Sequence, residues 1–90
     1  MAVLVLVQSF DPPITTEQLN ACAQRFDKCL EAHGARWVRS YLSKDRTRAI
    51  CEFEAPDAEQ VRASARSAGV PFDDCWTADM YARENPTASY

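Results

Sequence analysis

Glycine and histidine are scarce in this chain of 90 residues, which has only 2 Gly and 1 His. With so few glycines, the sequence offers no glycine-rich loop of the kind that cradles a phosphate group. The single histidine, His33, gives too little support for a mechanism built on a Ser-His-Asp or Cys-His arrangement. The hydrophobic fraction of 47% is nevertheless that of a compact globular domain.

Long apolar runs and clusters of basic residues are also missing. The apolar run at residues 2–7 is too short to span a membrane, and it lacks the basic segment that precedes a signal peptide core. The net charge of -3, with no basic stripe, argues against nucleic acid or an anionic membrane as the main partner. We therefore expect a cytoplasmic protein.

The cysteines do not form a metal-binding or redox motif. The chain has 4 of them, and none belongs to a CxxC pair. In a reducing compartment such thiols remain free and behave as small apolar side chains. We therefore expect Cys22, Cys29, Cys51 and Cys75 to be reduced core residues.

Hydrophobic periodicity and capping residues predict six elements. Four strands are expected at residues 3–10, 36–43, 47–54 and 74–80. A helix is expected at residues 16–33, because Thr15 and Gln18 form a capping-box pattern. A second helix follows the cap Asp57 and ends at Gly69. Residues 1–81 then form one domain, and residues 82–90 form a polar tail.

The element order βαββαβ predicts an α+β, ferredoxin-like fold. Right-handed crossovers place two helices on one face of a four-stranded antiparallel sheet, with the first and third strands central. The first strand is apolar on both faces, so the face without helices also needs a cover. We expect a second copy to supply it, giving a homodimer of the dimeric α+β barrel type with a cavity between the sheets.

The hairpin at residues 36–54 separates a core face from an open face. The predicted register pairs Ser40 with Cys51 and Val38 with Phe53 beneath the helices. The opposite face then carries aromatic and charged side chains, and Arg39 lies across from Glu52. The set predicted for this open face is Trp37, Arg39, Tyr41, Ile50, Glu52 and Glu54.

Paired carboxylates on the open face are the first candidate site. Glu52 and Glu54 alternate on one strand, so their Cα atoms are roughly 7 Å apart. They could hold a divalent cation, or one could act as a general acid or base if a dimer cavity excludes water. Tyr41 could donate a hydrogen bond to a ligand, with Trp37 and Arg39 as further ligand-binding residues. The alternative is a solvated surface with an Arg39–Glu52 ion pair contributing under ~1 kcal/mol.

Cys29 and His33 are the second candidate site. They are four residues apart on a helix, a spacing at which two side chains can chelate a borderline metal ion. The alternative is structural, with the thiol on the apolar stripe and His33 interacting with the helix dipole. The metal-ligand candidates are therefore Glu52, Glu54, His33 and Cys29.

The same hairpin and the helix after it resemble a known family of small bacterial proteins. The matching segments are residues 37–45 (WVRSYLSKD), residues 49–57 (AICEFEAPD) and the helix end at residues 68–71 (AGVP). The residues that carry the resemblance are Trp37, Ser40, Tyr41, Asp45, Cys51, Glu54, Ala55, Pro56, Gly69 and Pro71. The family is named after a nickel-binding member, and the resemblance implies a ferredoxin-like fold, a dimer and a nickel ligand.

Three functions follow as hypotheses. The first is a small dimeric metal-binding protein for nickel or another divalent ion. The second is a cofactor-independent enzyme of the monooxygenase, isomerase or cyclase type, which would act on an apolar small molecule in the dimer cavity with Tyr41, Glu52 and Glu54 as catalytic residues. The third is an interaction or regulatory module whose open face serves only self-association.

Overall fold

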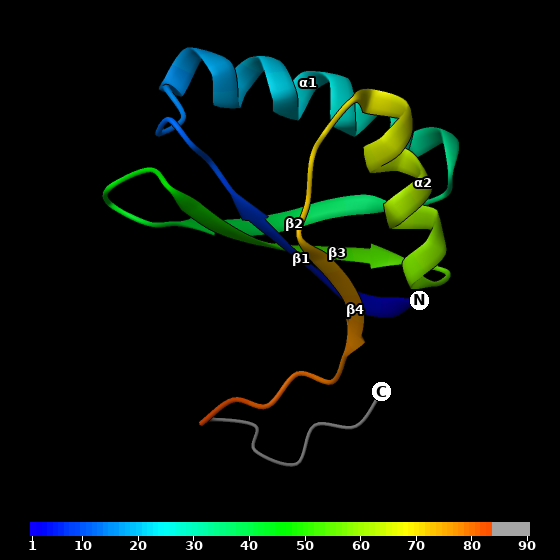
Figure 1. Cartoon of the computed structure of the whole chain (residues 1–90). Helices are drawn as coiled ribbons and strands as arrows, with labels where there is room; N and C mark the ends of the chain where they lie inside the picture. The colour runs from blue at the N-terminus through cyan, green and yellow to red at the C-terminus, as the bar shows by residue number, and fades with distance from the viewer. Residues whose placement is uncertain (84–90) are drawn as a thin grey trace.

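The computed structural model describes residues 1–83 (Figure 1). Its elements are β1 (Ala2–Ser9), α1 (Thr16–Ala32), β2 (Arg36–Leu42), β3 (Arg48–Ala55), α2 (Ala58–Ala68) and β4 (Asp74–Ala78). This order confirms the βαββαβ prediction, and every strand boundary lies within two residues of its predicted place. The predicted polar tail at residues 82–90 falls, apart from residues 82 and 83, outside the described residues.

The four strands form one antiparallel sheet in the order β2-β3-β1-β4. Strands β1 and β3 are therefore central, as predicted. Both helices lie over one face of the sheet, with α1 along its length and α2 beside the end of α1 (Figure 1). The fold is thus the ferredoxin-like α+β arrangement, and no helix of residues 1–83 lies over the other sheet face.

Capping residues fix where each helix begins and ends. The Thr15 hydroxyl accepts a hydrogen bond from the Gln18 backbone N–H at 3.1 Å, and the Gln18 side chain accepts one from the Thr15 N–H at 2.9 Å. Asp57 caps α2 with a single bond, in which its carboxylate accepts from the Gln60 N–H at 3.0 Å. After α2 the backbone turns left-handed at Gly69, with φ of 69°, a conformation that glycine adopts without steric cost.

The core lies between the helices and the sheet face that they cover. Leu4 and Leu6 of β1 are fully buried there, next to Phe53 of β3. The rings of Phe26 and Phe53 join α1 to the sheet, with their centroids 5.3 Å apart. The small residues of α2 that share this core are Ala58, Ser64, Ala65 and Ala68. They allow α2 to pack close to the sheet.

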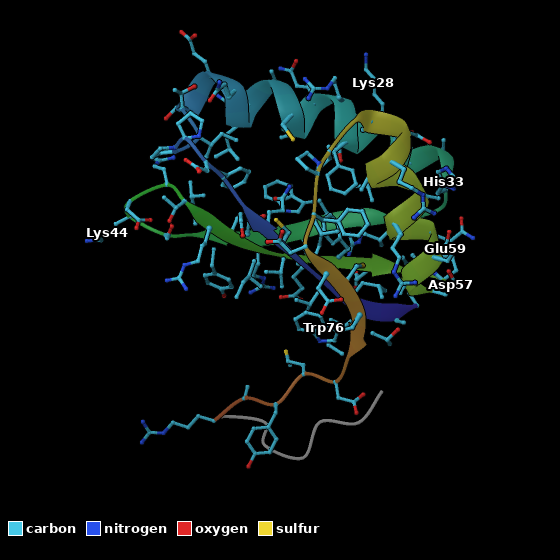
Figure 2. The ribbon with its side chains drawn as sticks, in the orientation of Figure 1. Lys28, His33, Lys44, Asp57, Glu59 and Trp76 are labelled. Carbon is cyan, nitrogen blue, oxygen red and sulfur yellow. The ribbon has the colours of Figure 1, made fainter. Side chains whose placement is uncertain are left out.

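The uncovered sheet face, which we call the open face, carries an apolar strip. The β1 side chains on this face, Val3, Val5 and Val7, are half-buried although neither α1 nor α2 lies over them. Ile50 and Trp76 flank the strip from the neighbouring strands and are 49% and 42% exposed. Trp76 points away from the helix layer (Figure 2). The open face therefore carries an exposed apolar patch along its central strands.

No helix within residues 1–83 has the length and hydropathy needed to cross a lipid bilayer.

Candidate functional site

The charged pairs predicted for the open face are present. Arg39 lies directly across from Glu52 in the β2–β3 register, as the sequence predicts. The Arg39 Nε atom is 3.4 Å from Oε1 of Glu52. One step along the hairpin, Arg36 forms a second ion pair with Glu54. Each predicted carboxylate therefore already has a guanidinium partner in this structure.

These ion pairs lie at the border of the apolar strip. The Arg39 and Glu52 side chains are 57% and 27% exposed, so water screens their attraction to under ~1 kcal/mol. Tyr41 is paired with Ile50 on the same face and is 66% exposed. Arg39, Tyr41, Glu52 and Glu54 thus share one surface, as predicted. An incoming cation or polar ligand could displace the exposed arginines at little energetic cost.

Trp37 lies on the opposite side of the sheet from its predicted place, and this prediction was wrong. A β-bulge lies between Trp37 and Arg39, so Trp37 pairs with Phe53, and Val38 is the extra residue instead of the partner of Phe53. The Trp37 indole N–H then donates to the Ser40 hydroxyl at 2.8 Å. The bulge reverses the faces of Arg36 and Trp37, which precede it in β2, while it preserves the register from Arg39 onward.

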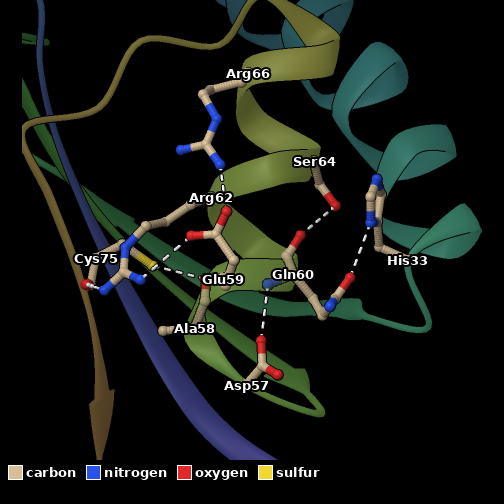
Figure 3. Close-up of polar contacts among 9 residues, drawn as sticks. All are labelled: His33, Asp57, Ala58, Glu59, Gln60, Arg62, Ser64, Arg66 and Cys75. Carbon is tan, nitrogen blue, oxygen red and sulfur yellow. Dashed lines mark hydrogen bonds and ion pairs between the residues drawn. The ribbon is translucent and has the colours of Figure 1, made fainter.

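The helix pair Cys29 and His33 lies in the helix layer. His33 is the C-cap of α1, and its Nδ1 atom is 2.9 Å from the Gln60 side-chain oxygen of α2 (Figure 3). The His33 backbone N–H also donates to the Cys29 carbonyl at 3.2 Å. His33 therefore links the C-terminal end of α1 to α2. The position of His33 at the helix end is the one that the structural alternative assumed, but the imidazole contacts Gln60 of α2, which the sequence did not predict.

The four predicted metal ligands are not assembled within one chain. Glu52 and Glu54 lie on the open face, whereas Cys29 and His33 lie in the helix layer on the other side of the sheet. Within residues 1–83, no group of three or more His, Cys, Asp and Glu side chains is close enough to hold a metal ion. The combined four-residue set is therefore ruled out as a single-chain site, because the sheet separates its two halves.

A cleft between α1 and the β2 edge was missed by the sequence reasoning. Its volume is about 340 Å³, and Trp37, Ser40, Cys51 and Phe53 form its floor. The α1 side chains form its wall, and Gln8 of β1 closes its inner end. The sequence did contain one signal: Gln8 is a lone polar residue on the buried face of a strand that is otherwise apolar on that face.

Three of the cysteine thiols have low reactivity at neutral pH. Burial raises the pKa of the Cys51 thiol, and burial likewise raises the pKa values of Cys75 and Cys22. A raised pKa keeps a thiol protonated at neutral pH, so it is a poor nucleophile and a poor metal ligand. All four cysteines are free, as predicted. Cys51 and Cys75 are buried, whereas Cys22 and Cys29 are only half-buried.

The match to a protein family extends over most of the chain. Residues 5–77 match the family described as nickel responsive protein SCO4226-like. The chain belongs to this family. The crystal structure of SCO4226 from Streptomyces coelicolor A3(2) is similar to it with a TM-score of 0.81 at 21% sequence identity. That similarity covers 90% of this chain and 100% of the other, and at this identity it shows the shared fold alone. Among curated proteins, none matches this chain.

Proposed function

We propose that this protein is a small cytoplasmic homodimer that binds nickel or another divalent ion. The observation that carries the proposal is membership, over residues 5–77, of a family described as nickel responsive. Within residues 1–83 of one chain, no cluster of three possible ligands is present, so the proposed site needs a second chain. A metal site would then combine donors from two copies. The four free thiols support a reducing compartment.

The open face supports the dimer. It exposes Ile50, Trp76 and half-buried valines on two central strands and an edge strand. A chain of 90 residues gains much stability from covering such a surface, since small domains bury a modest share of their surface alone. Packing two open faces together would bury the apolar strips and leave the charged pairs at the border.

The same packing supports the metal site. Glu52 and Glu54 of each copy lie beside the strip, so a sheet-to-sheet dimer would bring carboxylates from two chains near one interface. Carboxylate oxygens suit hard and borderline divalent ions. Binding would require Arg39 and Arg36 to release their exposed carboxylate partners. That release costs little, because each exposed pair contributes under ~1 kcal/mol.

Titration calorimetry with Ni²⁺ on tag-free protein tests the proposal. We expect binding at micromolar concentration, which the double variant Glu52→Gln/Glu54→Gln removes because it deletes the carboxylates while it keeps their shape. The matched control Cys29→Ser/His33→Gln should retain the binding. No heat with wild-type protein at micromolar concentration would contradict metal binding, and loss of heat only in the control would move the site to α1.

The alternative is a cofactor-independent enzyme that uses the same interface. It is favoured by one observation: Tyr41, Glu52 and Glu54 share the open face with an apolar strip, as a cavity for an apolar small molecule would need. A crystal structure of the dimer distinguishes the two functions. A closed apolar cavity with a carboxylate inside it supports the enzyme, whereas a flat, solvent-filled interface counts against it.

A further inference from the structure

The cleft between α1 and the β2 edge has the construction of a small-molecule site. The β2 strand is an edge strand, and α1 does not cover it fully, so Trp37 and Ser40 remain exposed on the helix side of the sheet. The wall on α1 is largely apolar and contains Leu19, Ala23, Phe26 and Leu30. The volume of about 340 Å³ is at the lower end of the range of small-molecule pockets.

The Trp37 ring is the exposed aromatic part of the cleft floor. Because its indole N–H donates to the Ser40 hydroxyl at 2.8 Å, the ring is held in one orientation. The side chain is still 51% exposed, an unusual state for a large aromatic residue that lies on the helix side of the sheet. A second aromatic ring placed against Trp37 would cover this surface.

The Gln8 side-chain amide lines the cleft and can form further hydrogen bonds. Gln8 is 5% exposed, its Nε2 donates to the Pro71 carbonyl at 3.0 Å, and its Oε1 accepts from the Cys51 thiol at 3.6 Å. A primary amide has two donors and two acceptor positions, so these contacts leave one of each without a partner among residues 1–83. A ligand hydroxyl or carbonyl could use either position.

The described lining of the cleft offers no buried counter-charge to an ionic ligand. Asp27 is the one charged residue of the described lining, and it is exposed. An anionic ligand would be repelled by Asp27, and a cationic one would find no buried carboxylate inside. The Cys51 thiol adds no charge, since burial raises its pKa.

We propose that the cleft between α1 and the β2–β3 hairpin binds a neutral aromatic small molecule of about two rings that carries one hydroxyl or carbonyl group. The rings lie between Trp37 and the apolar wall of α1, and the polar group meets the Gln8 amide. The site lies on the helix side of the sheet, away from the open face. The proposed ligand site therefore depends neither on dimer formation nor on metal binding.

Nuclear magnetic resonance of ¹⁵N-labelled full-length protein tests the site directly. The chain has 2 Trp, and their indole N–H signals report on opposite sides of the sheet: Trp37 lines the cleft, and Trp76 lies on the open face. Trp37→Phe assigns the signals. On titration with 2-naphthol we expect a saturable shift of the Trp37 signal and an unchanged Trp76 signal. No saturable shift at Trp37, or equal shifts of both signals, would overturn the proposal.

Two related probes test the chemical class. Naphthalene lacks the hydroxyl and should bind about fivefold more weakly than 2-naphthol, the usual effect of one neutral hydrogen bond. The anion 2-naphthoate should bind more weakly still. Its carboxylate would either be repelled by Asp27 or lose its hydration against the apolar side chains of α1. Equal affinity for naphthalene and 2-naphthol would overturn the role of Gln8, and preference for 2-naphthoate would overturn the neutral class.

A filled cleft provides the matched variant. Ala23→Phe places a ring in the cleft from an exposed position of α1, so the core is left intact. We expect this variant to lose the saturable Trp37 response, while its Trp76 signal stays at the wild-type position and confirms the fold. The control Ala21→Phe adds the same ring to α1 outside the described lining and should bind as wild type does. Equal binding by both variants would contradict the site.

Discussion

At the scale of single residues, Asp45 is the side chain with the most strongly shifted ionisation. It lies in the turn between β2 and β3, where its carboxylate accepts hydrogen bonds from the Ser43 hydroxyl at 2.7 Å and from the Thr47 hydroxyl at 2.7 Å. The Thr47 backbone N–H donates to the same oxygen at 3.1 Å. These bonds lower the pKa of Asp45 from 3.8 to about 2. Asp45 therefore holds the turn closed through its charged form.

This ionisation makes the hairpin sensitive to acid. A lowered pKa stabilises the folded state fully above pH 3.8, and this stabilisation is lost as the pH falls from 3.8 toward about 2. We expect Asp45→Asn to lower the free energy of unfolding at pH 7, and the difference from wild type to shrink at pH 3. Urea unfolding at both pH values measures this.

The control Asp79→Asn removes the same charge outside the turn, and at pH 7 it should change stability less than Asp45→Asn does. A difference between Asp45→Asn and wild type that is equal at pH 7 and pH 3 would show that the charge of Asp45 is not what holds the turn.

Single residues also show which side-chain positions could be predicted from the sequence and which could not. Alternation correctly placed Arg39, Tyr41, Glu52 and Glu54 on the open face, because each strand keeps a period of two beyond the bulge. It misplaced Trp37, because one extra residue in β2 shifts the alternation of side chains between the two faces. No local sequence pattern predicts that bulge. The Trp37–Ser40 hydrogen bond depends on the bulge, so the sequence could not predict it either.

At the scale of elements, the helix ends follow from short local patterns. The Thr15 and Asp57 caps and the left-handed Gly69 are each set by residues within four positions, so the sequence alone predicted them. The way the elements pack is set by contacts distant in sequence, such as that between Gln60 and His33. For that reason the contact between His33 and α2 was not predicted, and the structural alternative named only an interaction of His33 with the dipole of its own helix.

The α2 cap gives an element-scale prediction. Asp57→Ala should lower the free energy of unfolding by about 1 kcal/mol, because the Gln60 N–H loses its acceptor at the start of the helix. Chemical denaturation followed by circular dichroism measures the change. The control Ser67→Ala, at an exposed position of the same helix, should stay within about 0.5 kcal/mol of wild type. Equal losses in the two variants would contradict a capping role.

At the scale of the whole molecule, the sheet divides the chain into two independent surfaces. The helix side holds the core and the cleft at the β2 edge, and the open face holds the apolar strip with its two ion pairs. The sequence predicted the open face from the two-sided apolar pattern of β1. It could not predict the cleft, because the volume left between α1 and β2 depends on how the helix crosses the sheet.

The proposed function depends most on two open faces meeting. Sedimentation equilibrium of tag-free protein measures this directly, against a chain mass of 10.1 kDa. We predict a species of twice that mass at micromolar concentration for wild type. Ile50→Lys should give a single-chain species, because it places a charge in the strip. Ala21→Lys, a control on α1, should remain a dimer. A single-chain mass for wild-type protein across this range would contradict the account.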